Sequence, residues 1–233
     1  MKLVLDFDGV LFDTAYEAYV VAIATYERMN DVKLTIPYED FLECRPIVGP
    51  AWNYKYVLDC LINDNTNDLI DRIADATHED YGMFETCFFK TRELIKGSDF
   101  VEWLKLNKPF DFIEVLCSMD LDWSNVYIVS TKDKKTIVDI VAEYPLLKID
   151  SKNIYGSYSF DKYASKGEVI INEITACSEG VVFIDDMAEH LDSYLDDEKV
   201  IKLLPSWGYI SQLERKRAKN LDEVLEILNS SIL

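Results

Sequence analysis

The second half of the chain alternates between short apolar segments and amphipathic segments, and this alternation limits the possible folds most. The apolar segments are predicted strands at 126–129, 154–155, 181–184 and 200–204. The segments between them are predicted helices at 134–143, 167–176 and 187–195. Strands that alternate with helices form a mainly parallel sheet with helices on both faces. We therefore expect an α/β core.

The first strand, at 3–5, belongs to the same sheet, although a long helical stretch follows it. From Thr14, which we expect to be an N-cap, apolar residues repeat at steps of three and four, and residues 14–96 contain no convincing strand. The 233 residues exceed one average domain of ~150 and fall short of two. We predict a core of residues 1–13 and 97–233, interrupted by an all-helical domain of residues 14–96. Residues 221–228 are predicted to form a terminal helix.

Composition excludes several classes of protein. Hydrophobic residues make up 49% of the chain, which is enough for a packed core and too much for a disordered one. The formal net charge of −19 disfavours binding to nucleic acid or to an anionic membrane. The longest apolar stretch, 18–26, is shorter than the ~20 residues of a membrane span. Because Asp6 and Asp8 interrupt the apolar start, we expect no signal sequence and a cytoplasmic protein.

The five cysteines are widely spaced and form no Cys-x-x-Cys pair. Such a set indicates reduced thiols, most of them in the core, rather than disulfides or a zinc site. His78 and His190 have no second histidine at a ligand spacing, so we assign neither a catalytic role. Oligomeric state cannot be derived from these features.

The segment Asp6-Phe7-Asp8-Gly9 carries the strongest chemical signal. Acids at i and i+2 on an extended backbone point to the same side. Two carboxylates that close repel one another unless a cation accompanies them or one of them holds a proton. Gly9 permits a sharp turn directly after the pair. The pattern predicts a reaction centre at the end of the first strand.

This segment resembles the first signature of the haloacid dehalogenase (HAD) superfamily, whose phosphatases carry Asp-x-Asp-Gly-(Val/Thr) after their first strand. Later segments resemble the other signatures in family order. The strand at 126–129 leads to a hydroxyl residue, Ser130 or, as the alternative, Thr131. A lysine, Lys166 or alternatively Lys162, precedes a helix. The strand at 181–184 ends in Asp185-Asp186, where the family more often has Gly-Asp.

The resemblance implies a Rossmann-like core with a small helical cap domain, and a phosphatase that acts on a small phosphorylated metabolite. Asp6 would attack phosphorus and form an aspartyl-phosphate, and Asp8 would act as general acid and base. Ser130 and Lys166 would stabilise the charge on the phosphoryl oxygens. A phosphoglucomutase-like transferase and a catalytically idle binding protein are the alternatives.

The resemblance also implies Mg²⁺ as the cofactor. Its oxygen ligands would come from Asp6, the backbone carbonyl of Asp8, and one acid of the later pair, with Asp186 preferred over Asp185. Gly9 and Thr131 are further candidates for contact with the phosphate. In the helical block, Arg45 could clamp a second anionic group of the substrate. The alternative is that Arg45 is a surface residue and that the aromatic residues near it pack between helices.

Overall fold

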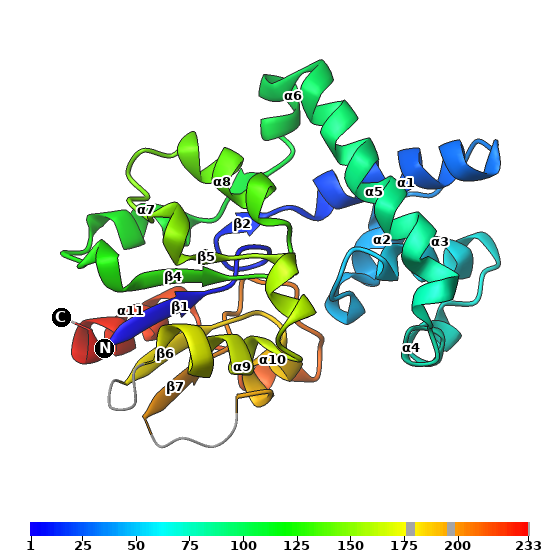
Figure 1. Cartoon of the computed structure of the whole chain (residues 1–233). Coiled ribbons are helices and arrows are strands. Elements are labelled where there is room, and N and C mark those ends of the chain that lie inside the picture. The colour runs from blue at the N-terminus through cyan, green and yellow to red at the C-terminus, as the bar shows by residue number, and fades with distance from the viewer. Residues whose placement is uncertain (176–179, 195–198, 233) are drawn as a thin grey trace. The chain divides into compact units, whose positions relative to one another are not determined.

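The computed structural model describes residues 1–175, 180–194 and 199–232 and divides the chain into two compact units (Figure 1). One unit consists of Met1–Asp13 and Pro109–Leu233, and the other is Thr14–Lys108. Within the described residues, no helix has both the length and the apolar composition needed to cross a lipid bilayer.

The second boundary between the units lies later in the chain than the expected position after residue 96. Helix α6 (Phe100–Leu104) follows α5 (His78–Ser98) and packs within the helical unit. The Trp103 indole N–H donates a hydrogen bond of 3.1 Å to Glu17, and the Lys96 ammonium lies 5.5 Å from the Trp103 ring centroid. These tertiary contacts assign α6 to the helical unit.

A five-stranded parallel sheet organises the first unit, in the order β5-β4-β1-β6-β7, so the predicted α/β class is confirmed. Its strands are β1 (Lys2–Leu5), β4 (Val126–Val129), β5 (Ile154–Tyr155), β6 (Val181–Ile184) and β7 (Val200–Leu203). The bounds of β4, β5 and β6 are those expected from the sequence. Short apolar runs with polar ends define such buried strands well.

Both faces of the sheet are buried. Val4 is in register with Tyr127 on β4 and with Phe183 on β6, so these side chains share one face. Apolar residues of α9 (Lys166–Val169), the π-helical turn η6 (Ile170–Ile174) and α10 (Ala188–Asp192) belong to the same core cluster. Leu3 and Leu5 alternate to the opposite face and are equally buried. Ala176 and Leu195, the expected ends of two helices, lie outside the described residues.

Among the described residues of this unit, the remaining elements are short strands, short 3₁₀ turns and three further helices. Helices α7 (Asp111–Ser118), α8 (Lys134–Ala142) and α11 (Leu221–Ser231) each bury an apolar stripe. The chain leaves the unit through β2 (Phe12–Asp13) and re-enters it through β3 (Lys108–Pro109). The single-turn elements are η3 (Trp123–Asn125), η4 (Ser151–Asn153), η5 (Ser157–Asp161) and η7 (Glu214–Lys216).

The second unit contains no strand between residues 14 and 96, all of which are described. Stacked aromatic rings fill its centre, with Tyr54 lying 5.3 Å from Phe41 and 5.6 Å from Phe88 between ring centroids. Its other elements are α1 (Ala15–Asn30), α2 (Tyr38–Glu43), η1 (Arg45–Ile47), α3 (Asn53–Ile62), η2 (Thr66–Asp68) and α4 (Leu69–Ala74). Thr14 stands at the N-cap of α1, but its side chain makes no capping hydrogen bond there.

Of the described cysteines, Cys44 and Cys60 are buried, whereas Cys87 and Cys117 are half-buried. All four are free thiols, as the sequence predicts. Cys177 lies outside the described residues. The expectation that most cysteines fill the core thus holds for two of the four.

Candidate active site

Polar residues follow three adjacent strands at one edge of the sheet. Asp6 follows β1, Ser130 follows β4, and Asp185 follows β6, and all three side chains are buried. Because the strands are parallel, their carboxyl ends meet at this edge. The predicted signatures after these strands are therefore brought together by the sheet itself.

The chain after β1 forms a tight turn that fixes the first signature. The Asp6 N–H donates to the Ile184 carbonyl at 2.9 Å, which ties the start of the turn to β6. The Phe7 carbonyl accepts hydrogen bonds from the N–H groups of Leu11 (3.1 Å) and Phe12 (3.0 Å). The Phe7 and Phe12 rings stack in the core, which leaves the acids on either side of Phe7 at the edge of the sheet.

Gly9 is the one residue of this turn that cannot carry a side chain. Its φ is +80°, a conformation that L-residues adopt at a cost. A Cβ added there would lie 2.0 Å from Asp186 Oδ2 and 2.9 Å from the Tyr209 ring. The glycine therefore lets the turn after β1 approach the acidic pair after β6.

Lys166 joins two of the predicted acids. Its ammonium lies 2.8 Å from Asp6 Oδ2 and 2.7 Å from Asp185 Oδ2, and all three side chains are buried. Lys162, the alternative lysine, is 69% exposed and pairs with Glu173 at 2.9 Å. The structure thus places Lys166 at this edge of the sheet and Lys162 in a solvent-exposed ion pair.

The three charges shift one another's pKa values. Burial raises the pKa of Asp6 above its usual range, and the lowering effect of Lys166 does not fully offset it. Burial acts in the same direction on Asp185, but Lys166 and His190 outweigh it and lower the pKa of that carboxyl. Burial alone would lower the pKa of Lys166, whereas Asp185 and Asp6 raise it. Asp185 is thus held ionised, and Asp6 is the acid of the pair that accepts a proton first.

Asp185 has further partners within its own segment. Its Oδ1 accepts the Met187 N–H at 2.9 Å, but Met187 is itself the N-cap residue of α10 and has no side-chain capping bond, so the expected capping of this helix by an acid of the pair is not observed. The same oxygen lies 3.1 Å from His190 Nδ1. We assigned His190 no role from the sequence because no second histidine accompanies it. Its position five residues after an acid, on the first turn of a helix, was the available signal.

The loop after β4 contributes a lysine that the sequence analysis did not single out. Ser130 is buried and its Oγ accepts the Lys132 N–H at 3.3 Å, whereas Thr131 is half-buried. The Lys132 ammonium lies 3.1 Å from Asp8 Oδ1. Both hydroxyl residues are thus at the carboxyl end of β4, and Lys132 connects this loop to the second acid of the first signature.

A second segment missed from the sequence is Trp207-Gly208-Tyr209, which follows β7. The Trp207 indole N–H donates to the Val10 carbonyl at 3.1 Å. The Tyr209 N–H donates to Asp186 Oδ2 at 2.7 Å, and its hydroxyl donates to Asp13 Oδ1 at 2.7 Å. This segment therefore ties the turn after β1 to Asp186, which follows β6. Its place after a parallel strand at the same edge was the signal that could have found it.

Gly208 is required for that close approach. A Cβ on Gly208 would lie 2.3 Å from Asp186 Cβ and 2.7 Å from the Gly9 carbonyl oxygen. Neither of these atoms can move without displacing the acidic pair or the turn after β1. Two glycines, on separate segments, thus make room for Asp186.

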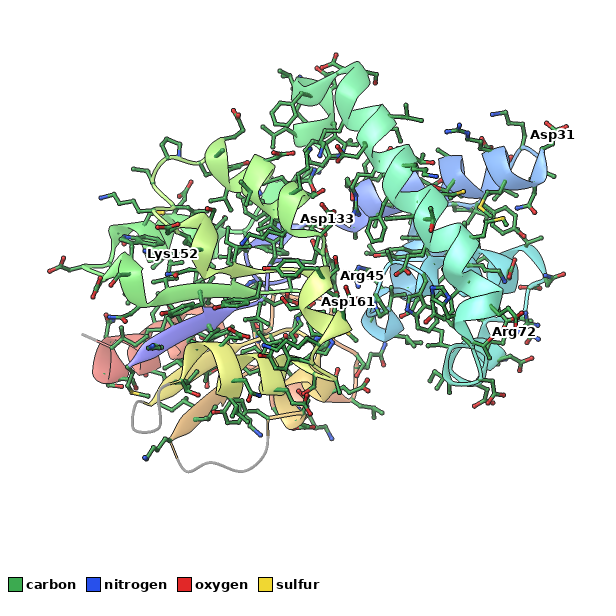
Figure 2. All side chains as sticks on the ribbon, in the orientation of Figure 1. Asp31, Arg45, Arg72, Asp133, Lys152 and Asp161 are labelled. Carbon is green, nitrogen blue, oxygen red and sulfur yellow. The ribbon has the colours of Figure 1, made fainter. Side chains whose placement is uncertain are left out.

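Arg45 belongs to the helical unit, in η1 (Figure 2). Its side chain is buried and Nη1 donates to the Val48 carbonyl at 2.9 Å. The structure does not make it a surface residue, and a guanidinium that bonds a nearby carbonyl supports a structural role for Arg45. Contact between Arg45 and a substrate stays a prediction.

The charges at the sheet edge do not balance. The carboxyl groups are those of Asp6, Asp8, Asp185 and Asp186, and the ammonium groups are those of Lys132 and Lys166. With all six groups ionised, their formal charges sum to −2. Asp6, Asp185 and His190 offer ligand atoms within 4.8 Å of one another. Asp185 rather than Asp186 belongs to this group, although Asp186 was the preferred ligand. The carboxylate oxygens of this group are ligands that suit a hard divalent cation, whereas the His190 nitrogen is not one.

No protein-family model matches the sequence, and no curated protein matches it. Among solved structures, a predicted phosphatase from Clostridium acetobutylicum aligns with a TM-score of 0.67 at 18% identity, over 98% of this chain and 97% of that one. A haloacid dehalogenase-like family hydrolase from Streptococcus pneumoniae aligns with a TM-score of 0.57 at 19% identity, over 98% and 96% of the two chains.

A predicted phosphoglycolate phosphatase from Haemophilus somnus aligns with a TM-score of 0.61 at 12% identity, over 98% of this chain and 96% of that one. At these identities the likeness establishes the fold. The chain has the fold of these solved structures, which are named as phosphatases and as a haloacid dehalogenase-like hydrolase.

Proposed function

We propose that the protein is a Mg²⁺-dependent phosphomonoesterase that hydrolyses a small phosphorylated metabolite through an aspartyl-phosphate on Asp6. The observation that carries this proposal is the buried group Asp6–Lys166–Asp185, with Asp8 two residues beyond the nucleophile and paired to Lys132. The names of the structural neighbours agree with this reaction class. The cap role of the helical unit is part of the same proposal.

In the first step, an Asp6 carboxylate oxygen attacks phosphorus, and the bond between phosphorus and the ester oxygen breaks. Lys166 holds the Asp6 carboxylate from one side and offsets negative charge near the phosphoryl group. The Ser130 hydroxyl, at the end of the neighbouring strand, donates a hydrogen bond to a phosphoryl oxygen. The phosphoryl group is then carried on Asp6.

Asp8 acts as the general acid in the first step and as the general base in the second. It gives its proton to the ester oxygen as the alcohol leaves, and the resulting carboxylate takes a proton from the water that attacks the aspartyl-phosphate. Inorganic phosphate departs and the Asp6 carboxylate is restored. Asp8 suits this role because its side chain is only half-buried, so water and a leaving group can reach it.

Mg²⁺ fits the residues present. Carboxylate oxygens are its preferred protein ligands, and carboxyl groups outnumber ammonium groups at this edge of the sheet. Asp6, Asp185 and the Asp8 carbonyl would hold it, with Asp186 as the further candidate. A bound Mg²⁺ supplies positive charge next to the phosphoryl oxygens.

Phosphate release from p-nitrophenyl phosphate tests the proposal. We expect activity with Mg²⁺, loss of activity in EDTA, restoration by added Mg²⁺, and a loss of at least ~10³-fold in Asp6→Asn, since the nucleophile is removed. Asp161→Asn is the matched control, because Asp161 is exposed on the same unit (Figure 2). Complete inertness of the wild-type protein towards this ester and a broad panel of phosphometabolites would refute the proposal.

A further inference from the structure

Lys132 is a nearly buried ammonium in contact with Asp8. Its side chain is 3% exposed, whereas that of Asp8 is 16% exposed, and the two groups lie 3.1 Å apart. The Phe7 ring centroid lies 5.9 Å from Lys132 Nζ. An ammonium removed from water is costly unless a counter-charge accompanies it. This pair therefore differs from the solvent-exposed ion pairs of the same unit, such as Lys162–Glu173.

The loop that carries Lys132 is fixed by its neighbours. The Lys132 N–H donates to Ser130 Oγ, and its carbonyl accepts the Ser157 N–H at 2.9 Å. A Cβ on Gly156 would lie 2.9 Å from the Lys132 carbonyl oxygen and 2.5 Å from the backbone nitrogen of Lys134. The loop after β4 is thus packed closely against the chain after β5, and its position does not depend on the ion pair alone.

We propose that Lys132 is a positioning residue for the proton transfers of Asp8. This inference rests on the proposed function. The ammonium, 3.1 Å from Asp8 Oδ1, fixes the direction of the Asp8 carboxyl group, so that its proton passes to the ester oxygen as the phosphorus–oxygen bond breaks. Lys132 acts through Asp8, whereas Lys166 acts on the nucleophile and the phosphoryl group.

If Lys132 acts through Asp8, the loss of activity on replacing Lys132 depends on the leaving group of the ester. Phenolate, about as basic as the side chain of tyrosine, leaves poorly without a proton. p-Nitrophenolate is a much weaker base and leaves without help. Loss of a residue that acts only through the acid should therefore slow phenyl phosphate more than p-nitrophenyl phosphate. The two esters have nearly the same shape, so differences in binding largely cancel.

The test compares kcat/KM for both esters with Mg²⁺ in the wild type, Lys132→Met and Lys132→Arg. kcat/KM is used because it reports the steps up to departure of the leaving group. General acids contribute about 10²–10⁴-fold, so we expect Lys132→Met to lose ~10–100-fold more activity with phenyl phosphate than with p-nitrophenyl phosphate. Lys132→Arg keeps the charge and should recover most of the loss.

Lys135→Met is the matched control, because Lys135 lies three residues away, is 65% exposed and pairs with Asp139 on the surface. It should behave like the wild type with both esters. Lys166→Met should reduce activity with both esters to a similar extent, since its role does not depend on the leaving group.

A double-mutant cycle with Asp8→Asn separates an action through Asp8 from a separate role. We expect Lys132→Met to change phenyl phosphate hydrolysis by less than ~2-fold in the Asp8→Asn background, because the acid is already absent. A full additional loss in that background would overturn the inference, as would equal losses with both esters in Lys132→Met.

Circular dichroism and melting curves establish that each variant is folded, and Lys132→Gln, which retains a hydrogen-bond donor, replaces Lys132→Met if the latter does not fold. If the wild type hydrolyses neither these esters nor any phosphometabolite of the broad panel, the proposed function fails. If the wild type hydrolyses both and the variants show no leaving-group selectivity, only the role of Lys132 fails.

Discussion

Replacing Lys166 with methionine should destabilise the α/β unit strongly, because it leaves Asp6 and Asp185 buried without their shared ammonium. Both distances are below 3 Å, and the lysine side chain is 1% exposed, so solvent cannot take over its role. Removing one partner of a buried ion pair costs about 3–5 kcal/mol. A loss of that size lowers the melting temperature by roughly 6–20 °C for a chain of this length.

Thermal unfolding of metal-free protein, followed by circular dichroism at pH 7.5, measures this loss. Lys162→Met is the matched control, because it removes an exposed lysine paired with Glu173, and such pairs contribute at most about 1 kcal/mol. A change in melting temperature of less than ~3 °C in Lys166→Met would refute the reasoning, because it would mean that the two acids do not need the ammonium.

The same variant should respond to pH in a definite direction. Burial, together with Asp185, raises the pKa of Asp6 in the wild type, and loss of Lys166 removes the main opposing effect. The folded protein then binds a proton on Asp6 more readily than the unfolded chain does, so stability falls as pH rises. We expect the deficit of Lys166→Met to be smaller at pH 5 than at pH 7.5. An unchanged deficit would contradict this coupling.

Gly208, Arg92 and Asp6 each make a close contact whose loss or titration has a measurable effect. Gly208→Ala should reduce activity at least ~10-fold and raise the Mg²⁺ concentration needed for half-maximal rate, because the added Cβ would lie 2.3 Å from Asp186 Cβ. A variant that reaches half-maximal rate at the same Mg²⁺ concentration as the wild type would contradict this. Arg92→Met should lower the free energy of unfolding in urea by about 3–5 kcal/mol, since it strands the buried Glu17 carboxylate, which lies 2.8 Å from Arg92 Nε. At subsaturating Mg²⁺, kcat/KM should fall as the pH is lowered, with a midpoint above the ordinary aspartate pKa of about 4, because burial raises the pKa of Asp6. A midpoint below ~3 would contradict this prediction.

The strands and the first signature could be predicted because their signals are local. The segments at 126–129, 154–155 and 181–184 are apolar runs with polar ends, and the structure gives them the same bounds. The motif Asp-x-Asp-Gly after a strand predicts two acids on one side of the chain, followed by a sharp turn. The parallel sheet then brings Ser130 and Asp185 to the edge where this motif lies. Periodicity and short motifs contain this information.

The parts that the sequence did not reveal depend on contacts between distant residues. The second boundary between the units lies after Lys108 and not after residue 96, because Trp103 donates a hydrogen bond to Glu17, 86 residues earlier in the chain. Lys132 forms an ion pair with Asp8 that spans 124 positions of the sequence. Tyr209 bonds to Asp13 across 196 positions. No local pattern distinguishes these side chains from ordinary loop residues.

The most direct test of the proposed mechanism is to trap the phosphoryl group on Asp6. The Asp8→Asn variant is the protein to use with p-nitrophenyl phosphate and Mg²⁺, because this leaving group needs no acid whereas hydrolysis of the intermediate lacks its base. We predict a stoichiometric burst of p-nitrophenol and, after acid quench and peptide mapping, phosphate on Asp6. Turnover without a burst, or phosphate on a different side chain, would contradict the account.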